Sequence, residues 1–512
     1  MPSARIFRQK ALAALTACPY YAAMSKPAAR SFRIVCEHRH TTAVEALLRA
    51  QGYEFEPEPF SPLCRRLLAE PRPLGSSLAA FFGYIYIQDR SSMLPPVALA
   101  PTMGASVLDM CASPGSKTGF LAQLVGRTGF VLGNEPSPTR LGTLRANLHQ
   151  CNLIQAGTCL YSGDALPLHP ASWNAILLDP PCSGWGTAEK HPQVLKLWQG
   201  DKLDSLTTLQ QRLLRHAAHL LAPGGSLVYS TCTTNVAENE DQVRFAEEEL
   251  GLVREHLAPI PGFVWEELPG GEGTLRVDGA RSQAQGFYVA RLRKPGAMPD
   301  GGTGGTQGSG AGSAQGNTDS GPLGGPAAAS GSADGVSPRS VWDSEFSGSS
   351  RFGRKRAGRA SRQSSGQALG QTLGQALGQT LGQPLPPDCL AGPTCDPALL
   401  PPGQAVLYGD HVRFIPSQAA ALLPQNCIWQ GALLGKLCGG RLDAAPRLRT
   451  LMPEEPDAAS SLVLEDLNDI SALLSGQSRQ TGLQGREAAL WWRDLPLGRV
   501  ALKNGRAVAG FR

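Results

Sequence analysis

The chain has 512 residues, which is enough length for roughly two to four domains. Its formal net charge of +5 is mild; it permits a nucleic-acid partner without proving one. No run of about 18 apolar residues is present, so we expect no membrane span, and Met1–Leu15 lacks the apolar core and cleavage site of a signal peptide. None of the 12 cysteines forms a Cys-x-x-Cys pair, which argues against a zinc ribbon, and a long chain without a secretion signal argues against a disulfide framework.

Residues 1–79 are expected to form a small accessory domain of helical or mixed structure. Thr42–Gly52 is helix-like, with Gly52 as its stop. Pro27–Val35 mixes basic and apolar residues, and both a solvated strand edge and an RNA-facing surface remain open for it. Ala80–Pro96 then predicts a strand, a polar turn and a helix at the start of the next domain.

Residues 80–295 alternate between strand and helix signals. The predicted strands are Ser106–Met110, Gly129–Gly133, Thr158–Tyr161, Ala175–Leu178 and a strand from Ser226. The predicted helices are Thr118–Val125, Thr139–Cys151 and Leu206–Leu221. This alternation is typical of an α/β fold with a parallel sheet and helices on both faces.

Residues 296–400 are of low complexity, with a basic cluster at Arg351–Arg362, and we predict a disordered linker. The cluster either tethers a phosphate backbone or is only a soluble charge run. From residue 401 to residue 512 ordered structure is expected again. Two short strands flank the hairpin signal Gly409-Asp410, and a further strand with basic residues covers Leu497–Arg506, so this region is expected to be β-rich.

Two cysteines follow predicted strands of the same sheet. Asp179-Pro180-Pro181-Cys182 comes directly after Ala175–Leu178, and the prolines end that strand because they cannot donate to a ladder. Cys232 ends the strand that starts at Ser226. In open α/β sheets ligands bind at the carboxyl ends of the strands, so an acid and two thiols are expected at one active-site edge. The remaining cysteines, including Cys151 and Cys159, are expected to be small core residues.

A single-glycine loop follows the first strand of this domain. Its residues are Cys111, Ala112, Ser113, Pro114, Gly115, Ser116 and Lys117. The loop matches neither a Walker motif nor Gly-x-Gly-x-x-Gly. One glycine and a helix N-terminus suit a ligand with one small anionic group, such as the carboxylate of S-adenosylmethionine. Glu135, at the end of the next strand, is placed to bind a ribose, and Asp164, expected at the end of the third strand, is placed to meet an adenine.

Four motifs carry a resemblance to a known family: Asp109–Thr118, Asn134–Arg140, Asp179–Gly184 and Ser230–Thr233. With the supporting segment Tyr86–Met93, the chain resembles the Sun/Nop (Fmu-related) RNA cytosine-5 methyltransferases over residues 27–294. Within that family it is most similar to the RsmF type, which modifies small-subunit ribosomal RNA. The resemblance implies a Rossmann-like class I methyltransferase domain, an N-terminal RNA-binding accessory domain and C-terminal PUA-like RNA-binding modules.

The resemblance also implies roles for individual residues. Cys232 would be the nucleophile that adds to C6 of cytosine, Cys182 would assist release of the product, and Asp179 would bind the Watson–Crick edge of the base. Lys117 would lower the pKa of the thiolate or orient a partner of the base edge. S-adenosylmethionine would be held by the Cys111–Lys117 loop together with Glu135, Arg140, Asp164 and Asp179.

The family likeness has departures and further implications. Ser113 and Pro180 are small departures from the usual residues, and Arg276–Phe287 lacks the family's histidine, so no role is assigned there. The partner is expected to be RNA, either ribosomal RNA or a small ribosomal subunit. The protein is expected to be a cytoplasmic monomer without a metal. Trp185 and His191 could stack on a base or pack the loop, and Trp491-Trp492 is interpreted as a buried anchor in preference to an RNA platform.

Three other functions compete with this one. Transfer RNA could be the substrate of the same chemistry. A DNA cytosine-5 methyltransferase would use Cys182 as its nucleophile, but the Thr231-Cys232 motif and the lack of a DNA-reading insertion argue against it. A non-catalytic RNA-binding assembly factor could retain the fold, although the complete set of Asp179, Cys182 and Cys232 argues against loss of activity.

Overall fold

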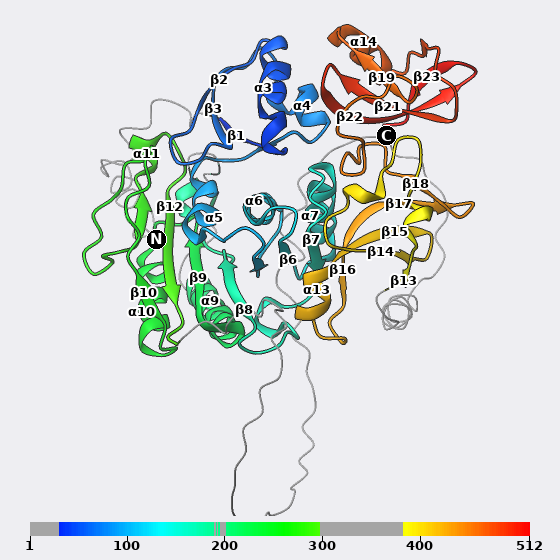
Figure 1. Cartoon of the computed structure of the whole chain (residues 1–512). Helices are drawn as coiled ribbons and strands as arrows, with labels where there is room; N and C mark the ends of the chain where they lie inside the picture. The colour runs from blue at the N-terminus through cyan, green and yellow to red at the C-terminus, as the bar shows by residue number, and fades with distance from the viewer. Residues whose placement is uncertain (1–29, 189–190, 192, 195–200, 297–381, 512) are drawn as a thin grey trace, which may run out of the picture. The chain divides into compact units, whose positions relative to one another are not determined.

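The computed structural model describes residues 30–188, 191, 193–194, 201–296 and 382–511. Its largest sheet has nine strands, and eight of them follow the order β10-β12-β9-β8-β5-β6-β7-β16, with β11 paired to β12 (Figure 1). In chain order the strands are β5 (Ser106–Asp109), β6 (Phe130–Asn134), β7 (Ala156–Cys159), β8 (Trp173–Leu178), β9 (Leu221–Thr231), β10 (Val253–Glu255), β11 (Leu275–Val277), β12 (Phe287–Arg293) and β16 (Trp429–Gln430).

Strands β5 to β9 pair in parallel, whereas β12 runs antiparallel to β9. Neighbouring residues on each strand face opposite sides of the sheet. Leu108 packs in one core cluster with α9 (Asp201–Leu220) and α10 (Glu240–Glu248). Val107 packs in another with α5 (Leu94–Leu99), α6 (Ser116–Val125) and α7 (Pro138–Gln150). The predicted parallel sheet with helices on both faces is confirmed.

Local sequence explains where the site-bearing elements begin and end. Helix α7 starts at Pro138, and its N-cap Ser137 accepts a hydrogen bond from the N–H of Arg140. Strand β8 ends at Leu178, directly before Asp179-Pro180-Pro181. The predicted helix Leu206–Leu221 is the C-terminal part of the longer helix α9.

The N-terminal sheet has the order β2-β3-β1-β4 and packs against α3 (Thr41–Ala50). Its strands are β1 (Ser31–Ile34), β2 (Glu54–Pro57), β3 (Cys64–Ala69) and β4 (Ile85–Ile87). Strand β1 lies between β3 and β4 and is fully buried. Both interpretations of Pro27–Val35 were therefore wrong for the strand itself, because the basic side chain of Arg33 is buried and contacts α6 instead of solvent or a partner.

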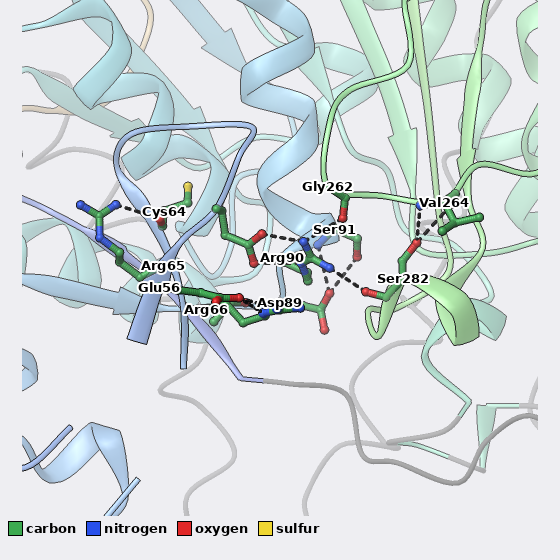
Figure 2. Close-up of polar contacts among 12 residues, drawn as sticks. Glu56, Cys64, Arg65, Arg66, Asp89, Arg90, Ser91, Gly262, Val264 and Ser282 are labelled. Carbon is green, nitrogen blue, oxygen red and sulfur yellow. Dashed lines mark hydrogen bonds and ion pairs between the residues drawn. The ribbon is translucent and has the colours of Figure 1, made fainter. Parts of the chain in front are cut away.

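Arg90 joins this N-terminal region to the segment before β12 (Figure 2). Its guanidinium forms a bidentate, buried ion pair with Glu58 and also donates to the carbonyls of Ser282 and Gly262. Close by, Asp89 accepts from the N–H and hydroxyl of Ser91. A planar guanidinium with several fixed donors is suited to hold separate loops in one geometry.

The C-terminal region contains two further five-stranded sheets with orders β13-β14-β15-β17-β18 and β19-β21-β22-β23-β20. Their strands are β13 (Gln383–Pro384), β14 (Gly403–Tyr408), β15 (His411–Pro416), β17 (Ala432–Cys438), β18 (Arg441–Ala444), β19 (Ser461–Leu464), β20 (Arg479–Gln480), β21 (Glu487–Trp492), β22 (Leu495–Lys503) and β23 (Arg506–Ala509). The predicted hairpin at Gly409-Asp410 and the β-rich character are confirmed, whereas a PUA-like identity stays a prediction.

Two other expectations concern this region. Residues 297–381, with the basic cluster, lie outside the described residues. The predicted linker ended too late, because residues 382–400 already include β13, which pairs with β14 and gives its backbone a partner. Trp491 and Trp492 are 0% and 2% exposed, so they are the predicted buried anchor. Across the described ranges, no helix is long and apolar enough to cross a bilayer.

Candidate active site

Strands β5, β6, β8 and β9 end at the same edge of the parallel sheet. They are followed there by the cofactor-type loop, Glu135, Asp179 and Cys232 respectively. The chain order runs outward in both directions from the boundary between β5 and β8, since β6 and β7 lie on one side and β8 and β9 on the other. Such a switch point is where open α/β sheets bind ligands.

The loop between β5 and α6 is held tightly from two sides. Gly115 has φ +105° and is the N-cap of α6, a conformation that favours glycine. The hydroxyl of Thr118 donates to Asp109 at 2.7 Å, and Asn147 donates to the carbonyl of Pro114 at 2.8 Å. The first N–H groups of α6, from Ser116 onward, have no helical acceptor and can bind an anionic group.

Two of the predicted cofactor residues lie beside this loop. Glu135 is 1% exposed and accepts from the N–H of Ser137 at 2.9 Å. Arg140 reaches Glu135 at 3.3 Å and donates to the carbonyl of Ser113 at 3.2 Å. Burial raises the pKa of the neighbouring Cys111 thiol well above its usual range, which suits a packing residue and not a nucleophile.

The prediction that Asp164 ends the third strand is wrong. Strand β7 ends at Cys159, so Asp164 belongs to the short 3-10 turn Gly163–Ala165 and not to the strand end. Its carboxylate is bonded to Ser162 and forms an ion pair with Arg212 of α9 at 2.7 Å. The strand lies two residues earlier than the predicted Thr158–Tyr161, because the buried run covers Ala156–Cys159 and Leu160 is 43% exposed.

Asp179 is the centre of a polar cluster. It accepts from Lys117 Nζ on one oxygen and from the hydroxyl of Ser230 on the other, both at 2.8 Å. Burial opposes the charge of Lys117, but the attraction of Asp179 outweighs it, and the pKa of Lys117 is raised. The ammonium also lies 5.4 Å from the ring centre of Phe287. Lys117 is therefore held as a fixed cation at the strand ends.

The two thiols lie side by side, with Cys182 Sγ and Cys232 Sγ 3.3 Å apart. The hydrogen bond between them raises the pKa of Cys182, and burial raises it further, well above the usual range. The same hydrogen bond, helped by Lys117, lowers the pKa of Cys232 even though burial and Asp179 oppose this. Cys182 is thus suited to keep its proton and Cys232 to be the thiolate.

The structure brings Lys117, Asp179, Cys182 and Cys232 into one cluster and places Glu135, Arg140 and the Cys111–Lys117 loop next to it. Trp185 follows Cys182 in a 3-10 turn, and its indole N–H has no acceptor among the described residues. His191 is exposed. Sequence reasoning missed three residues: Ser230, which donates to Asp179; Phe287, whose ring lies near Lys117; and Glu238, a buried carboxylate that accepts from Ser183 beside Cys182. Ser230 was visible as part of the Ser230–Thr233 motif, whereas the sequence holds no spacing signal for the other two.

Comparison with known proteins decides the family. The model of the family described as 16S rRNA methyltransferase RsmB/F matches residues 96–293. Over these residues the chain belongs to the RsmB/F methyltransferase family. Its segment of that family contains the switch point, the cofactor-type loop and both thiols, so the predicted Rossmann-like methyltransferase fold is confirmed.

Curated relatives of this RsmB/F chain include two proteins named ribosomal RNA small subunit methyltransferase F. The one from Cronobacter sakazakii is 36% identical over 306 residues, which are 57% of this chain and 62% of the relative. The one from Erwinia tasmaniensis is 38% identical over 241 residues, 45% of this chain and 49% of the relative. The chain thus spans less than two thirds of the length of these relatives.

Among solved structures, a methyltransferase homolog protein from Pyrococcus horikoshii is 30% identical. The match covers 54% of this chain and 89% of that protein, with a TM-score of 0.46.

Proposed function

We propose that this protein transfers a methyl group from S-adenosylmethionine to C5 of a cytosine in RNA, with small-subunit ribosomal RNA as the substrate. The observation that carries the proposal is the thiol pair 3.3 Å apart, in which the pKa of Cys232 is lowered and that of Cys182 is raised. Membership of the RsmB/F family and the names of the relatives support the choice of ribosomal RNA.

Bound S-adenosylmethionine would supply an electrophilic methyl group. The Cys111–Lys117 loop and the N-terminus of α6 would hold its carboxylate, and Glu135 would accept from its ribose, with Arg140 fixing Glu135 and the loop. Asp164 is the candidate residue for contact with the adenine of the cofactor. These residues fit the cofactor because free helical N–H groups and a buried carboxylate lie on either side of one glycine loop.

The protein residues would act in a fixed order. Cys232 thiolate would add to C6 of cytosine, which makes C5 nucleophilic enough to bond the methyl carbon while the bond from that carbon to the sulfonium sulfur breaks and leaves a neutral thioether. Asp179 accepts a hydrogen bond from the Watson–Crick edge and favours the protonated base, while Lys117 stabilises the anionic groups beside it. A base then takes the C5 proton, the bond between C6 and Cys232 breaks, and Cys182 assists this release. The target cytosine must be unpaired or flipped out to reach the cluster.

The flanking regions would bind RNA around this centre. We assign RNA binding to an accessory domain in residues 1–79 and to the β-rich region 401–512, on either side of the catalytic domain 80–295, in a cytoplasmic monomer. Single-stranded or distorted RNA is recognised through shape and backbone contacts, which supports a need for additional modules.

The test is transfer of labelled methyl from S-adenosylmethionine to ribosomal RNA, transfer RNA and DNA. Wild type is compared with Cys232→Ala and Cys182→Ala. We expect RNA to be labelled, Cys232→Ala to be inactive, and Cys182→Ala to leave a trapped protein–RNA adduct. An active Cys232→Ala with an inactive, adduct-free Cys182→Ala would assign the nucleophile to Cys182, as in DNA-type chemistry. Labelling confined to transfer RNA would change the substrate. Binding of S-adenosylmethionine without any transfer would favour an assembly factor.

A further inference from the structure

A buried carboxylate lies next to the thiol pair and is not used by the chemistry above. Glu238, in the 3-10 turn Val236–Glu238, is 0% exposed. One oxygen accepts from Ser183 N–H at 2.8 Å and from Gln210 Nε2 at 3.1 Å. The other accepts from the Ser183 hydroxyl and from Asn235 Nδ2 at 3.3 Å. These four donors match the lone-pair sites of an ionised carboxylate.

The donors lie on both sides of Cys182. Ser183 follows Cys182 directly and binds Glu238 through two groups. Gln210, on α9, donates to Glu238 and also to the carbonyl of Pro181 at 3.0 Å. The peptide units before and after Cys182 are therefore anchored to one carboxylate and one amide, and the backbone that carries this thiol has little freedom to move.

The same network reaches the loop of the second thiol. The hydroxyls of Ser183 and Thr233 are 2.8 Å apart, and Thr233 follows Cys232 in the chain. The N–H of Gly186 donates to the carbonyl of Cys232 at 3.0 Å. Hydrogen bonds through Ser183 and Gly186 thus connect the two cysteine loops.

We propose that Glu238 is a positioning residue that holds the Cys182 loop against the Cys232 loop and so fixes the spacing of the two thiols. The proposal rests on the proposed function, because it assigns Glu238 a task in the two-thiol reaction. Glu238 does not touch the base or the cofactor in this role, and it acts through Ser183 and Thr233.

The charge of Glu238 adds a second effect to this geometry. The donors that the structure gives the Glu238 carboxylate, on Ser183, Gln210 and Asn235, are all neutral, so hydrogen bonds balance its charge. A nearby negative charge disfavours ionisation of a thiol, and Glu238 contributes to the raised pKa of Cys182, after the hydrogen bond to Cys232, burial and the charge of Cys232. Lys117 acts in the opposite direction on Cys232. Glu238 thus adds to the causes that keep Cys182 protonated, whereas Lys117 favours the Cys232 thiolate against the larger opposing effect of Asp179.

The experiment compares full-length wild type with Glu238→Gln, which keeps the side-chain size and removes the charge. Glu248→Gln is the matched control, because Glu248 is exposed on α10. Each protein is alkylated with iodoacetamide over roughly pH 6 to 9, and the modification of Cys182 and Cys232 is followed separately by peptide mass spectrometry. This readout needs neither RNA nor S-adenosylmethionine, so it remains informative if methyl transfer to RNA is not found.

In wild type and Glu248→Gln we expect Cys232 to react faster than Cys182. In Glu238→Gln the ratio of Cys182 to Cys232 reactivity should rise about fivefold or more, and a fivefold rise corresponds to less than one unit of pKa. The kcat of methyl transfer should fall about tenfold or more, with KM for S-adenosylmethionine within about twofold, because the change affects the spacing of the thiols and not the cofactor loop.

A second variant keeps the proposal testable if Glu238→Gln does not fold. Ser183→Ala removes the hydroxyl link to both Glu238 and Thr233 without changing a charge, and it should lower kcat with a smaller change in the reactivity ratio. The double variant should lose less than the product of the two single losses, because both act through one network. A reactivity ratio and a kcat within about twofold of wild type in both folded variants would overturn the proposal.

Discussion

The ammonium of Lys117 lies 2.8 Å from Asp179 and contributes to the lowered pKa of Cys232. At the scale of single residues, the ionisation of the two thiols therefore depends on which charged group lies next to which at the strand ends. Asp179 fixes the cation, the cation favours one thiolate, and the second thiol donates to it. The identities of Lys117, Asp179 and both cysteines were predicted from the sequence, because each follows a recognisable strand or loop.

Lys117→Met should shift the pH profile of Cys232 alkylation to higher pH. Removing the cation raises the pKa of Cys232, so less thiolate is present near neutral pH, and alkylation of Cys232 there should slow about tenfold per unit of pKa. Raising the pH should restore most of the rate. The measurement is the pH profile of Cys232 alkylation in the protein alone. A profile that superimposes on that of wild type would show that Lys117 does not act on the thiol.

Asp109 gives a prediction for stability against pH. Burial raises the pKa of this carboxyl from 3.8 to about 6, so the folded state prefers the protonated form. Stability from this group is present below its unfolded pKa and is lost as the pH rises to about 6. The pKa shift is about two units, and each unit corresponds to about 1.4 kcal/mol, so the free energy of unfolding falls by about 3 kcal/mol over this pH range.

Asp109→Asn should therefore increase the free energy of unfolding above about pH 6, relative to wild type, and change it little near pH 4. Urea denaturation at both pH values checks this. An equal effect at both values would assign it to the hydrogen bond with Thr118 instead of the charge.

At the scale of elements, the alternating strands and helices were predictable because the apolar periods of residues 106–231 change from strand to helix with turn residues between them. Pairing between distant strands was not predictable. Strand β1 was expected at a solvated edge or on an RNA-facing surface, but it lies inside its sheet because β4, about fifty residues later, covers its second side. Similarly, no local sequence pattern shows that β7 ends at Cys159, or that Glu238 contacts Ser183 beside Cys182.

Gly115 carries the prediction at this scale. A Cβ there would lie 2.9 Å from Leu144 Cδ1, and the residue has φ +105°. Gly115→Ala should lower the free energy of unfolding by about 1–3 kcal/mol and weaken binding of S-adenosylmethionine, since the loop must change its shape.

Gly142→Ala is the control for this substitution. Gly142 lies on α7, and no atom outside its own helix backbone and chain neighbours comes within 4 Å of the position that an added Cβ would take. Alanine there should stabilise the helix by about 0.5–1 kcal/mol. Denaturation and calorimetric titration of both variants give the comparison. Equal binding by both would mean that the loop tolerates the methyl group without moving.

At the scale of the whole molecule, the main sheet is completed by a distant part of the chain. Strand β16 pairs antiparallel with β7 through Trp429 and Cys159, and Trp429 contacts Phe130 with ring centres 5.8 Å apart. The sequence indicated a separate β-rich C-terminal region, but the two-residue strand Trp429–Gln430 is too short to produce a periodic signal.

Gly157→Ala should disturb this pairing. The added Cβ would lie 2.8 Å from two ring carbons of Trp429, and a rigid ring cannot yield as a flexible chain end does. We expect the free energy of unfolding to fall by about 1–3 kcal/mol and hydrogen exchange to become faster at residues 427–431. Trp429→Leu in the same background should recover part of the loss. A Gly157→Ala protein with unchanged exchange would show that the indole can move aside.

The late arrival of β16 has a consequence for synthesis of the protein. From Cys159 to Trp429 the ribosome must add 270 residues, which takes about 15–55 s at roughly 5–20 residues per second. During that interval the outer side of β7 has unpaired N–H and C=O groups and can pair with the same edge of another nascent chain. Folding of the main sheet is therefore complete only near the end of translation, and chains that stop before Trp429 should be prone to aggregate.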